Sequence, residues 1–596
     1  MKYRWEFRDT PDFESLAELS SALNDLPHPL TASLIHRSIE SLEEARLFFR
    51  PSLEELFDPF LMADMEKAVD RIIEAKVSDE RILVYGDYDV DGTTSVALIV
   101  SFLRTIGVDC DYFIPDRIEN GYGLSNAGID FAKQSDCSLI VALDCGITAV
   151  EEASYAMQQS VDLIICDHHT PPATLPEAFA ILNPKRIDCT YPFKELSACG
   201  VGFKLVQAIS QKLSLPSSSI ESYLDLAALS IGADIVPVES ENRILMSLGI
   251  ERIRQQPRMG IRQLAIVAGL DTTQCSTGQI VFGFAPRINA AGRVESADTA
   301  VDLLLSENLD DARRNANVLE ELNDRRRTLD HATLEQASAM AERMFLSRER
   351  HGVVLYDDRW HPGVIGITAS RIVEQFYRPA IMLTCVDGVA KGSARSIHGL
   401  NIYDVLSSCS DLLIQFGGHD YAAGMSLDVD AVDAFRDKFN EEVGKRMSAE
   451  LMIPGIRIDS PLDLSEIDGR FWAVLKQFEP FGPANSRPVF LGTSLQVVGQ
   501  PRTMGKSQNH IRFAVRSSHK GRVFKVIGFN MAGQMNVLKA AHFDKGTIDL
   551  LFSIEENEWK GTKTIELRAR DLRASESKSP PAQTTERTAL LVDSKS

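Results

Sequence analysis

The chain has 596 residues, of which 44% are hydrophobic and 25% are charged, values typical of globular proteins. This length predicts roughly three or four domains, and the composition excludes collagenous, coiled-coil and transmembrane architectures. The formal net charge of −21 disfavours a protein that coats nucleic acid through its overall charge, but it permits a local basic surface.

The cysteines and the N-terminal segment indicate in which cellular compartment the protein is found. The nine cysteines occur singly and without CxxC spacing, a pattern typical of reduced thiols. The first residues contain no apolar stretch after their basic side chains, so we expect neither a signal peptide nor a membrane span. We therefore predict a cytoplasmic protein that is not attached to a membrane.

The first half of the chain shows two sequence patterns. Residues 1–80 alternate charged and apolar side chains at helical spacing, which predicts a helical lead-in packed on the following domain. From residue 81 onward, short β-branched runs alternate with stretches long enough for helices. Near-continuous apolar strands of this kind are typical of a parallel sheet covered on both faces. We therefore predict an α/β domain over residues 81–305.

The middle of the chain predicts a connecting helix and a second domain. Residues 306–350 lack both Pro and Gly and place apolar side chains on one helical stripe. This pattern predicts a long, largely solvated helix that links two lobes. Strand-like runs then alternate with a helical stretch and Gly-rich turns, which predicts a second α/β domain over residues 351–450.

The last part of the chain predicts a small β-barrel in a domain spanning residues 451–574, because alternating strands and turns follow one another there. Residues 481–573 carry fifteen Lys and Arg against seven Asp and Glu, a net charge of +8, so the rest of the chain carries −29. This basic excess fits a surface for single-stranded nucleic acid, whereas most of the phenylalanines fit a barrel core. Residues 575–596 are rich in Ser, Pro and Thr and are predicted to be disordered.

The strongest chemical signal is GDYDVDG, in which a predicted strand runs into three aspartates before a helix begins. Alternate residues of an extended chain project to the same side, so Asp87, Asp89 and Asp91 can converge on one point, where cations must offset their repulsion. A calcium loop of the EF-hand type is the alternative interpretation. We reject it, because its bidentate Glu would fall on Leu98 and a strand precedes the motif where a helix is required.

Further acidic and imidazole side chains follow other apolar runs. They are Asp144 in LIVALDCGIT, Asp167, His168 and His169 in LIICDHHT, and Asp234 in ALSIGADIVP. Taken singly, each is more often a turn former, a helix cap or a structural histidine than a ligand. Because the carboxyl ends of parallel strands share one edge, where such folds place their sites, we expect the whole set to meet there.

This set predicts a metal centre. Carboxylates with one or two imidazoles suit hard divalent cations; the histidines favour Mn²⁺, and Mg²⁺ is also allowed. The carboxylates exceed what one ion needs, which indicates two ions about 3.5–4 Å apart with one bridging carboxylate. Such a pair generates hydroxide and stabilises both the attacking and the leaving oxygen of a phosphoryl displacement, so the predicted chemistry is phosphoester hydrolysis.

The motifs GDYDVDG, DCGIT, DHH and GADIVP resemble those of the DHH phosphoesterases. Further along, PRINAAGR, WHPGVIGITASR, KGSARS and FGGHDYAAG resemble the RecJ exonucleases of bacteria, a group within that family, and the resemblance covers nearly the whole chain. It implies a 5′-to-3′ exonuclease of DNA repair and recombination that degrades single-stranded DNA processively to mononucleotides. It also implies a DHH domain and a DHH-associated α/β domain joined by a long helix, followed by an oligonucleotide-binding β-barrel.

The resemblance also implies roles for individual residues. Asp89 and Asp144 would hold one ion, and Asp91, His168 and Asp234 would hold the other together with Asp144, the bridge. A separate set would grip the substrate, with Ser393 and Arg395 on the 5′ end and His419 near the scissile site. The substrate-binding residues implied in this way are Arg287, Arg293, Arg371, Ser393, Arg395, Gly418 and His419. Without the resemblance, Gly-Gly is usually a turn and a surface Arg is common.

His169 would contact the scissile phosphate or assist the leaving oxygen, and Asp167 would orient a neighbouring imidazole. One position departs from the pattern: many DHH phosphoesterases have a His four residues before Asp89, where this chain has Tyr85. A neutral phenol is a poor ligand for these ions. Either Asp87 takes its place or the first ion is held more loosely.

Two other functions are compatible with parts of the sequence. An oligoribonuclease or a phosphodiesterase for small nucleotides would resemble only the first two domains, so the basic barrel favours a polymer substrate. A non-enzymatic replication scaffold would have lost its ligands, which are present here apart from the Tyr85 position. The resemblance further implies a helicase and a single-stranded-DNA-binding protein as partners, and we expect a monomer.

Overall fold

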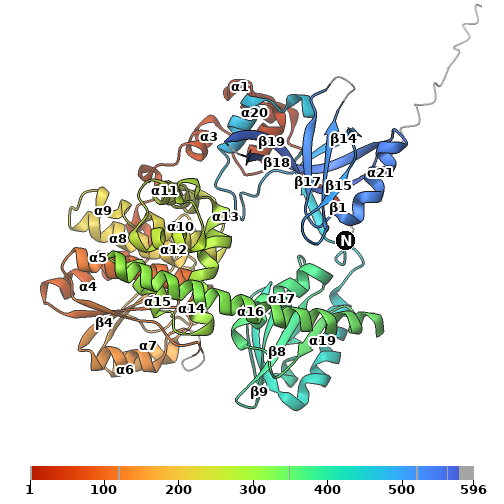
Figure 1. Cartoon of the computed structure of the whole chain (residues 1–596). Coiled ribbons are helices and arrows are strands. Elements are labelled where there is room, and N and C mark those ends of the chain that lie inside the picture. Colours follow the sequence, from red (N-terminus) through yellow and green to blue (C-terminus); the bar gives the residue numbers. More distant parts are fainter. Residues whose placement is uncertain are drawn as a thin grey trace, which may run out of the picture. The chain divides into compact units, whose positions relative to one another are not determined.

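The computed structural model describes residues 3–117, 121, 123–347, 350–517, 521–559 and 561–575. All but the first residue of the tail predicted at 575–596 lies outside this described part. The chain divides into two compact units, shown in Figure 1. The first unit comprises residues 1–4, 39–455 and 475–487, and the second comprises 5–38, 456–474 and 488–596.

The parallel sheet predicted for the first α/β domain is confirmed. Its strand order is β3-β2-β4-β5-β6, and every neighbouring pair is parallel. The strands are β2 (Arg81–Gly86), β3 (Cys110–Phe113), β4 (Cys137–Leu143), β5 (Asp162–Cys166) and β6 (Ala180–Leu182). The central strands are buried on both faces, as expected from their near-continuous apolar runs.

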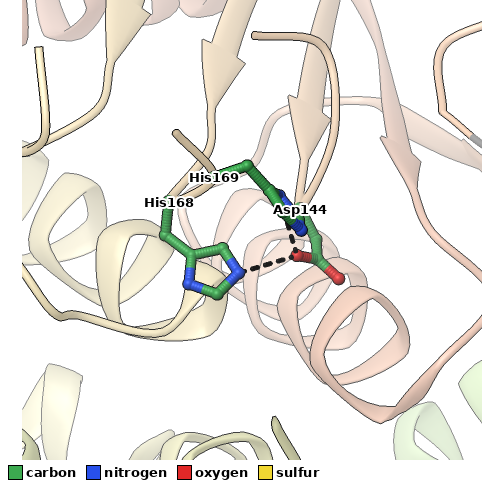
Figure 2. Close-up of side chains that lie close together, drawn as sticks. All are labelled: Asp144, His168 and His169. Carbon is green, nitrogen blue, oxygen red and sulfur yellow. Dashed lines mark ion pairs between the residues drawn. The ribbon is translucent and has the colours of Figure 1, made fainter. Parts of the chain in front are cut away.

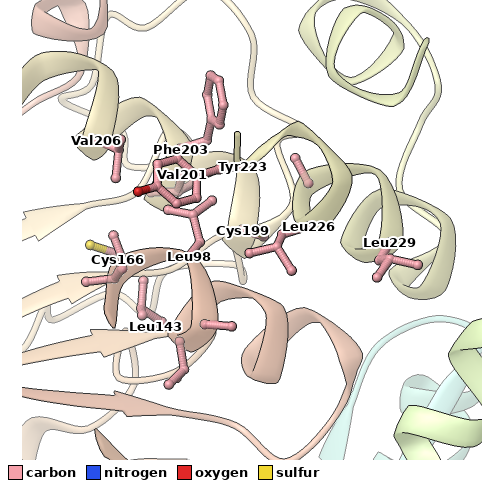
Figure 3. Packing of buried hydrophobic residues seen from close by; sticks show 14 of the residues in the cluster. Leu98, Leu143, Cys166, Cys199, Val201, Phe203, Val206, Tyr223, Leu226 and Leu229 are labelled. Atoms are coloured by element: carbon pink, nitrogen blue, oxygen red, sulfur yellow. The ribbon is translucent and has the colours of Figure 1, made fainter. Parts of the chain in front are cut away.

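Helices α5 (Val90–Thr105) and α8 (Ala198–Lys212) pack on the sheet, and α10 (Leu224–Asp234) packs on these two helices. Helices α5, α8 and α10 pack against one another. Figure 3 shows part of this core, in which Leu143 and Cys166 of the sheet lie near Leu98 of α5 and Phe203 of α8. Burial of this apolar surface holds the strand ends and helix ends that carry the charged side chains described below.

The long connecting helix is also confirmed, as α16 (Leu309–Ser347), drawn in green in Figure 1. It packs against α14 (Ala285–Val294) and α17 (Pro362–Phe376). Beyond it lies the second α/β domain, whose sheet has the order β10-β11-β9-β8-β7. Strands β7 and β8 are parallel and the others antiparallel. They are β7 (Val353–Tyr356), β8 (Ala380–Val386), β9 (Val389–Arg395), β10 (Gln415–Gly418) and β11 (Ala422–Asp428).

The second unit contains the predicted barrel. Seven strands pair in the order β13-β14-β18-β19-β17-β16-β15, and an additional β14–β16 pairing closes the sheet on itself. The strands are β13 (Ser460–Pro461), β14 (Phe490–Val497), β15 (Arg502–Met504), β16 (His510–Arg516), β17 (Phe524–Gly528), β18 (Thr547–Trp559) and β19 (Thr562–Ala574). Phe513, Phe524 and Phe552 are buried in its core, as expected, whereas Phe529 is 44% exposed.

The N-terminal segment differs in part from the helical lead-in, packed on the following domain, that was expected over residues 1–80. It begins with strand β1 (Arg4–Phe7) and continues with α1 (Phe13–Ala22) and α2 (His28–Ile35). Residues 5–38 belong to the second unit, where Trp5 packs beside Ile458, while 39–80 belong to the first. Among all described helices, none is long and apolar enough to cross a membrane.

Candidate metal centre

The turn after β2 presents the first aspartates. Asp87 follows the strand directly, and Asp89 caps helix α5 by accepting a hydrogen bond from the Gly92 N–H at 3.0 Å. Asp91 lies in the first turn of the helix. The turn is tight, because a Cβ on Gly92 would lie 2.3 Å from the carbonyl oxygen of Asp87. Only glycine therefore lets the helix start this close to the strand end.

Two neighbouring strands supply the next ligand-type side chains. Asp144 follows β4 with a left-handed φ of 62°, and its N–H donates to the carbonyl of Cys166 at 3.0 Å. His168 and His169 follow the next strand, β5. The expected edge of the parallel sheet therefore carries these residues. Asp234 differs, because it is the last residue of helix α10 and not the end of a strand.

The carboxylates and imidazoles form three overlapping groups, within each of which the ligand atoms lie within 4.8 Å of one another. The groups are Asp87, Asp89 and Asp144; Asp91, His168 and Asp234; and Asp144, His168 and His169. The three aspartates of GDYDVDG thus do not converge on one point as expected. Asp91 starts the helix and is turned toward a different group from Asp87 and Asp89.

His168 lies where these groups meet. Its Nε2 is 3.3 Å from Asp144 Oδ1, 3.6 Å from Asp234 Oδ2 and 3.9 Å from Asp91 Oδ2. Figure 2 shows that His168 and His169 both approach the same oxygen of the Asp144 carboxylate, Oδ1, with His169 Nδ1 at 4.0 Å. His168 Nδ1 is 3.1 Å from the carbonyl oxygen of Leu196. Since a carbonyl only accepts, Nδ1 carries the proton there and Nε2 presents a lone pair to the carboxylates.

Asp91 is held by the start of helix α8. The N–H groups of Ala198 and Cys199 each donate to its carboxylate at 2.8 Å, and Ser230 Oγ on α10 donates at the same distance. Free N–H groups at a helix N-terminus favour a negative charge. The fold thus fixes the orientation of this carboxylate before any ligand binds.

The acidic groups destabilise one another in the absence of a cation. Burial, followed by the charges of neighbouring aspartates, raises the pKa of Asp87, of Asp144 and of Asp234 well above the usual range of an aspartate. Burial and then Asp91 also raise the pKa of Asp89. Asp87 Oδ1 is buried without a hydrogen-bond partner among the described residues. Oxygen ligands that repel one another, one of them without a partner, fit divalent cations of the Mn²⁺ or Mg²⁺ kind.

His169 has a different environment. Its Nδ1 lies 2.7 Å from Asp167 Oδ1, while the other oxygen of Asp167 accepts the N–H of Ile147 at 3.0 Å. Burial opposes ionisation of Asp167, but the hydrogen bond from His169 outweighs it and lowers the pKa of Asp167 to about 2. Burial likewise opposes the charge on His169, yet the same bond raises the pKa of His169 to about 9. At neutral pH His169 is therefore protonated.

Tyr85 is directed away from the three groups. Its hydroxyl donates to the carbonyl of Gly123 at 2.7 Å, and its ring stacks on Phe113 with centroids 5.4 Å apart. A Cβ on Gly128 would lie 2.3 Å from the Tyr85 ring, so glycine makes room for it. The phenol is engaged elsewhere, whereas Asp87 joins Asp89 and Asp144, which agrees with the alternative that Asp87 takes the ligand place.

Arg293 connects the metal groups with the second α/β domain. It lies on α14, whose Gly292 is so close to the turn before α5 that a Cβ would be 2.5 Å from the carbonyl oxygen of Tyr88. Arg293 Nη1 donates to the carbonyl of Gly363 in α17 at 3.2 Å. Burial, and then the charges of other arginines, lower the pKa of Arg293 to about 10. Those arginines are Arg117, Arg326 and Arg395.

Ser393 and Arg395 lie together on β9, where Arg395 Nη1 donates to Ser393 Oγ at 2.9 Å. Helix α17 approaches both: a Cβ on its Gly366 would lie 3.0 Å from Ser393 Oγ and 3.2 Å from Arg395 Nη2. Arg371 is carried by the same helix, and its side chain is 43% exposed. The Ser393 hydroxyl and the Arg395 guanidinium thus lie together against α17, a combination that suits phosphate oxygens, and Arg371 is carried further along the same helix.

The structure places three other predicted residues apart from this cluster. Arg287 is buried and pairs with Glu320 of α16, and it also donates to the carbonyl of Gly283 at 2.7 Å. Its guanidinium is therefore occupied inside the protein and is not presented to a strand. Gly418 and His419 lie at the turn between β10 and β11, where the His419 N–H donates to the carbonyl of Ala422 at 2.8 Å. The exposed His419 side chain lies outside the three metal groups.

Sequence reasoning missed two arginines, Arg117 and Arg326. Arg117 lies over the ring of Tyr88 at 5.0 Å from its centroid, beside the first aspartates. Arg326 is buried on α16. Neither belongs to a Gly-rich or acidic motif, so the sequence offers no local signal for them. Their common feature is proximity to Arg293, which only the folded chain reveals.

Comparison with known proteins agrees with this architecture. Models of the DHH family N-terminal domain, the DHHA1 domain and the RecJ OB domain match residues 81–231, 349–445 and 458–571. The single-stranded-DNA-specific exonuclease RecJ of Bacillus subtilis is 37% identical over 96% of this chain and 71% of its own length. The protein of that name from Escherichia coli is 34% identical over 93% of this chain and 97% of its own length.

Solved structures give the same result. The crystal structure of RecJ in complex with Mn²⁺ from Thermus thermophilus matches with a TM-score of 0.81 at 28% identity, covering 96% of this chain and 80% of that one. A crystal structure of exonuclease RecJ bound to manganese matches at 33% identity and a TM-score of 0.57, covering 67% of this chain and 100% of that one. The chain therefore belongs to the RecJ family, whose curated members are named single-stranded-DNA-specific exonucleases.

Proposed function

We propose that this protein is a metal-dependent exonuclease that hydrolyses single-stranded DNA processively from its 5′ end to mononucleotides. One observation carries the proposal: buried and partly buried carboxylates and imidazoles from four segments form three groups that could hold metal ions, linked to one another through Asp144 and His168. The names of relatives that are 34–37% identical support single-stranded DNA as the substrate class. The resemblance of the motifs supports the polarity and the repair role.

The chain offers ligands for two cations, Mn²⁺ or Mg²⁺. Asp87 and Asp89 would hold one ion, Asp91 and Asp234 would hold the other with His168, and Asp144 would contribute to both. When bound, such ions generate hydroxide from water and stabilise the attacking and leaving oxygens of a phosphoryl displacement. Asp91 needs no rearrangement for this role, because helix α8 already orients its carboxylate.

His169 supplies a proton donor beside these ligands. Asp167 accepts from its Nδ1 and keeps the ring charged at neutral pH, so Nε2 also carries a proton. A charged imidazole can donate to a non-bridging phosphate oxygen or protonate the leaving 3′ oxygen of the cleaved ester. Either role places His169 in contact with the reacting group and Asp167 behind it.

Ser393 and Arg395 would anchor the 5′ phosphate, with Arg371 and Arg293 along the backbone and the exposed His419 near the scissile site. An anchor at a fixed distance from the metal ligands determines which ester reaches them, which accounts for release of single nucleotides. The barrel, with its net charge of +8 over residues 481–573, would bind the strand further along. A dedicated barrel favours a polymer over the dinucleotides cut by small phosphodiesterases.

We further propose that the protein acts as a monomer in the cytoplasm. All nine cysteines lie in described segments and none forms a disulfide, which agrees with a reducing compartment. Because the proposed enzyme requires a free single strand, a helicase would supply its substrate and a single-stranded-DNA-binding protein would deliver it.

A digestion series with end-labelled DNA tests the proposal. Strands labelled at the 5′ or the 3′ end, and a blunt duplex, are incubated with Mn²⁺ or Mg²⁺, and the products are separated by length. We expect mononucleotides from the 5′ end of single strands, little attack on duplex, and a loss of several orders of magnitude in rate for Asp144→Ala. Equal attack from both ends would refute the 5′ anchor. Unchanged activity of the variant would remove Asp144 from the mechanism.

A further inference from the structure

A buried carboxylate on the long helix faces the arginines of the proposed DNA path. Asp330 lies in α16, and its side chain is only 2% exposed. Its Oδ2 is 3.1 Å from Arg371 Nη1, and its Oδ1 accepts from Thr368 Oγ1 at 3.4 Å. Both partners belong to α17, so Asp330 reaches across the contact between two helices.

Arg326, one turn earlier on the same helix, completes the arrangement. Its Nη1 lies 3.8 Å from Asp330 Oδ2, and its Nη2 donates to Asn323 Oδ1 at 2.5 Å. Arg326 is buried, whereas the Arg371 side chain is 43% exposed. Asp330 thus lies between two arginines: the buried Arg326 and the partly exposed Arg371.

Among the described residues, Asp330 is the only acidic partner of Arg371. Within the described part of the chain this ion pair involves Nη1 alone, so it restrains the guanidinium without engaging Nε or Nη2. A planar guanidinium held by one nitrogen presents its other donors in a defined direction, which reduces the entropy lost when it binds a phosphate. Arg371 shares its helix with Gly366, which lies against Ser393 and Arg395.

From this geometry we propose that Asp330 is a positioning residue, which holds Arg371 in the orientation that contacts a phosphate of the DNA strand. The inference rests on the proposed function and deepens it, because it names the group that organises one part of the strand-binding surface. Asp330 itself does not contact DNA, since it is enclosed by α16 and α17.

The direction of the change in DNA affinity distinguishes a positioning role of Asp330 from a simple effect of its negative charge. Removal of a negative charge beside a polyanion strengthens binding when only the overall field matters. Removal of a group that orients a cation weakens binding, although the net charge becomes more positive. Asp330→Asn keeps the shape of the side chain and removes its charge, so the two explanations predict opposite changes in affinity.

The test is a double-mutant cycle with Asp330→Asn, Arg371→Gln and the double variant. Binding of a 5′-fluorescent oligothymidylate is measured by anisotropy in EDTA over a series of salt concentrations. We expect each single variant to weaken binding about tenfold, as for loss of one charge-assisted contact. The double variant should bind no more weakly than Arg371→Gln alone. The salt dependence of binding should fall by about 0.7 in slope in all three variants, which corresponds to one phosphate on a single strand.

Two further variants separate positioning from a structural role. Asp225→Asn is the matched control, because Asp225 is a fully buried carboxylate whose Oδ1 lies 2.8 Å from an arginine, Arg258, away from α17. It should lower the melting temperature but leave DNA affinity and salt slope unchanged. Asp330→Glu, which keeps the charge, should recover part of the affinity. In cleavage assays, Asp330→Asn should raise KM about tenfold and change kcat by less than about twofold.

Tighter binding by Asp330→Asn, or additive losses in the double variant, would overturn the proposal. So would an effect limited to the melting temperature. The cycle is measured without divalent cations, so it gives a result even if the wild-type protein cleaves no DNA. A failure of the proposed function would therefore appear as absent digestion by the wild-type protein, and a failure of this inference as absent coupling.

Discussion

Asp144→Asn should stabilise the metal-free protein while it abolishes the response to Mn²⁺. Ligand atoms of Asp87, Asp89 and Asp144 lie within 4.8 Å of one another. Burial is the largest cause that raises the pKa of Asp144, and the charges of the neighbouring aspartates raise it further. A carboxyl group whose pKa is raised by folding destabilises the folded state at neutral pH. Replacement by a neutral amide of the same shape removes that penalty.

The size of the effect follows from the distances. Two full charges 4.8 Å apart repel by roughly 3 kcal/mol at an effective dielectric constant of about 20. Uptake of a proton by the group relieves part of this repulsion, so we expect a net gain of about 1–2 kcal/mol in the free energy of unfolding. For a domain of this size the gain corresponds to a rise of about 2–8 °C in melting temperature.

Differential scanning calorimetry in EDTA measures this difference. At pH 8 the variant should melt above the wild type, and the gap should shrink at pH 5, because the carboxyl groups of the wild type then become neutral. Addition of Mn²⁺ should reverse the order, since only the wild type gains stability from binding. Asp225→Asn, the same substitution in a carboxylate paired with Arg258, should lose stability. A variant of Asp144 that melts below the wild type in EDTA would refute the reasoning.

Other consequences concern the proton donor, the anchor and the barrel. Asp167→Asn should slow cleavage about 10–100-fold, because His169 loses the partner that orients it; an unchanged rate in single-turnover assays would exclude this role. Arg395→Gln should lower the preference for 5′-phosphorylated over 5′-hydroxyl strands about tenfold in kcat/KM, and an equal loss on both substrates would contradict the anchor. Arg502 and Arg512 face each other across β15 and β16, so replacing both with Gln should reduce the salt slope of long-strand binding by about 1.4, measured by anisotropy.

The sequence predicts best what depends on local pattern. Runs such as RILVYG and SLIVAL are apolar on both faces, so their parallel pairing and the shared strand edge follow from composition alone. The position of Asp144 and His168 at that edge follows in turn. The long helix is equally predictable, because no Pro or Gly interrupts residues 309–347.

Other features depend on contacts between distant segments. Asp234 joins the site from the end of a helix, and its place is set by packing of α10 against α5. The motif PRINAAGR predicts Arg287 as a phosphate ligand, but in the folded chain Arg287 forms an ion pair with Glu320. The sequence shows no boundary near residue 38. Apolar side chains before this residue pack in the second unit and those after it pack in the first, but both segments have the same kind of apolar pattern. These outcomes are decided by tertiary contacts rather than by local propensity.

The central claim is that two divalent cations lie between these side chains. Anomalous diffraction from crystals grown with Mn²⁺ tests it most directly. We expect two peaks about 3.5–4 Å apart, one near Asp89 and one near His168, both within reach of Asp144. An empty cluster, a single peak, or manganese bound elsewhere would contradict it.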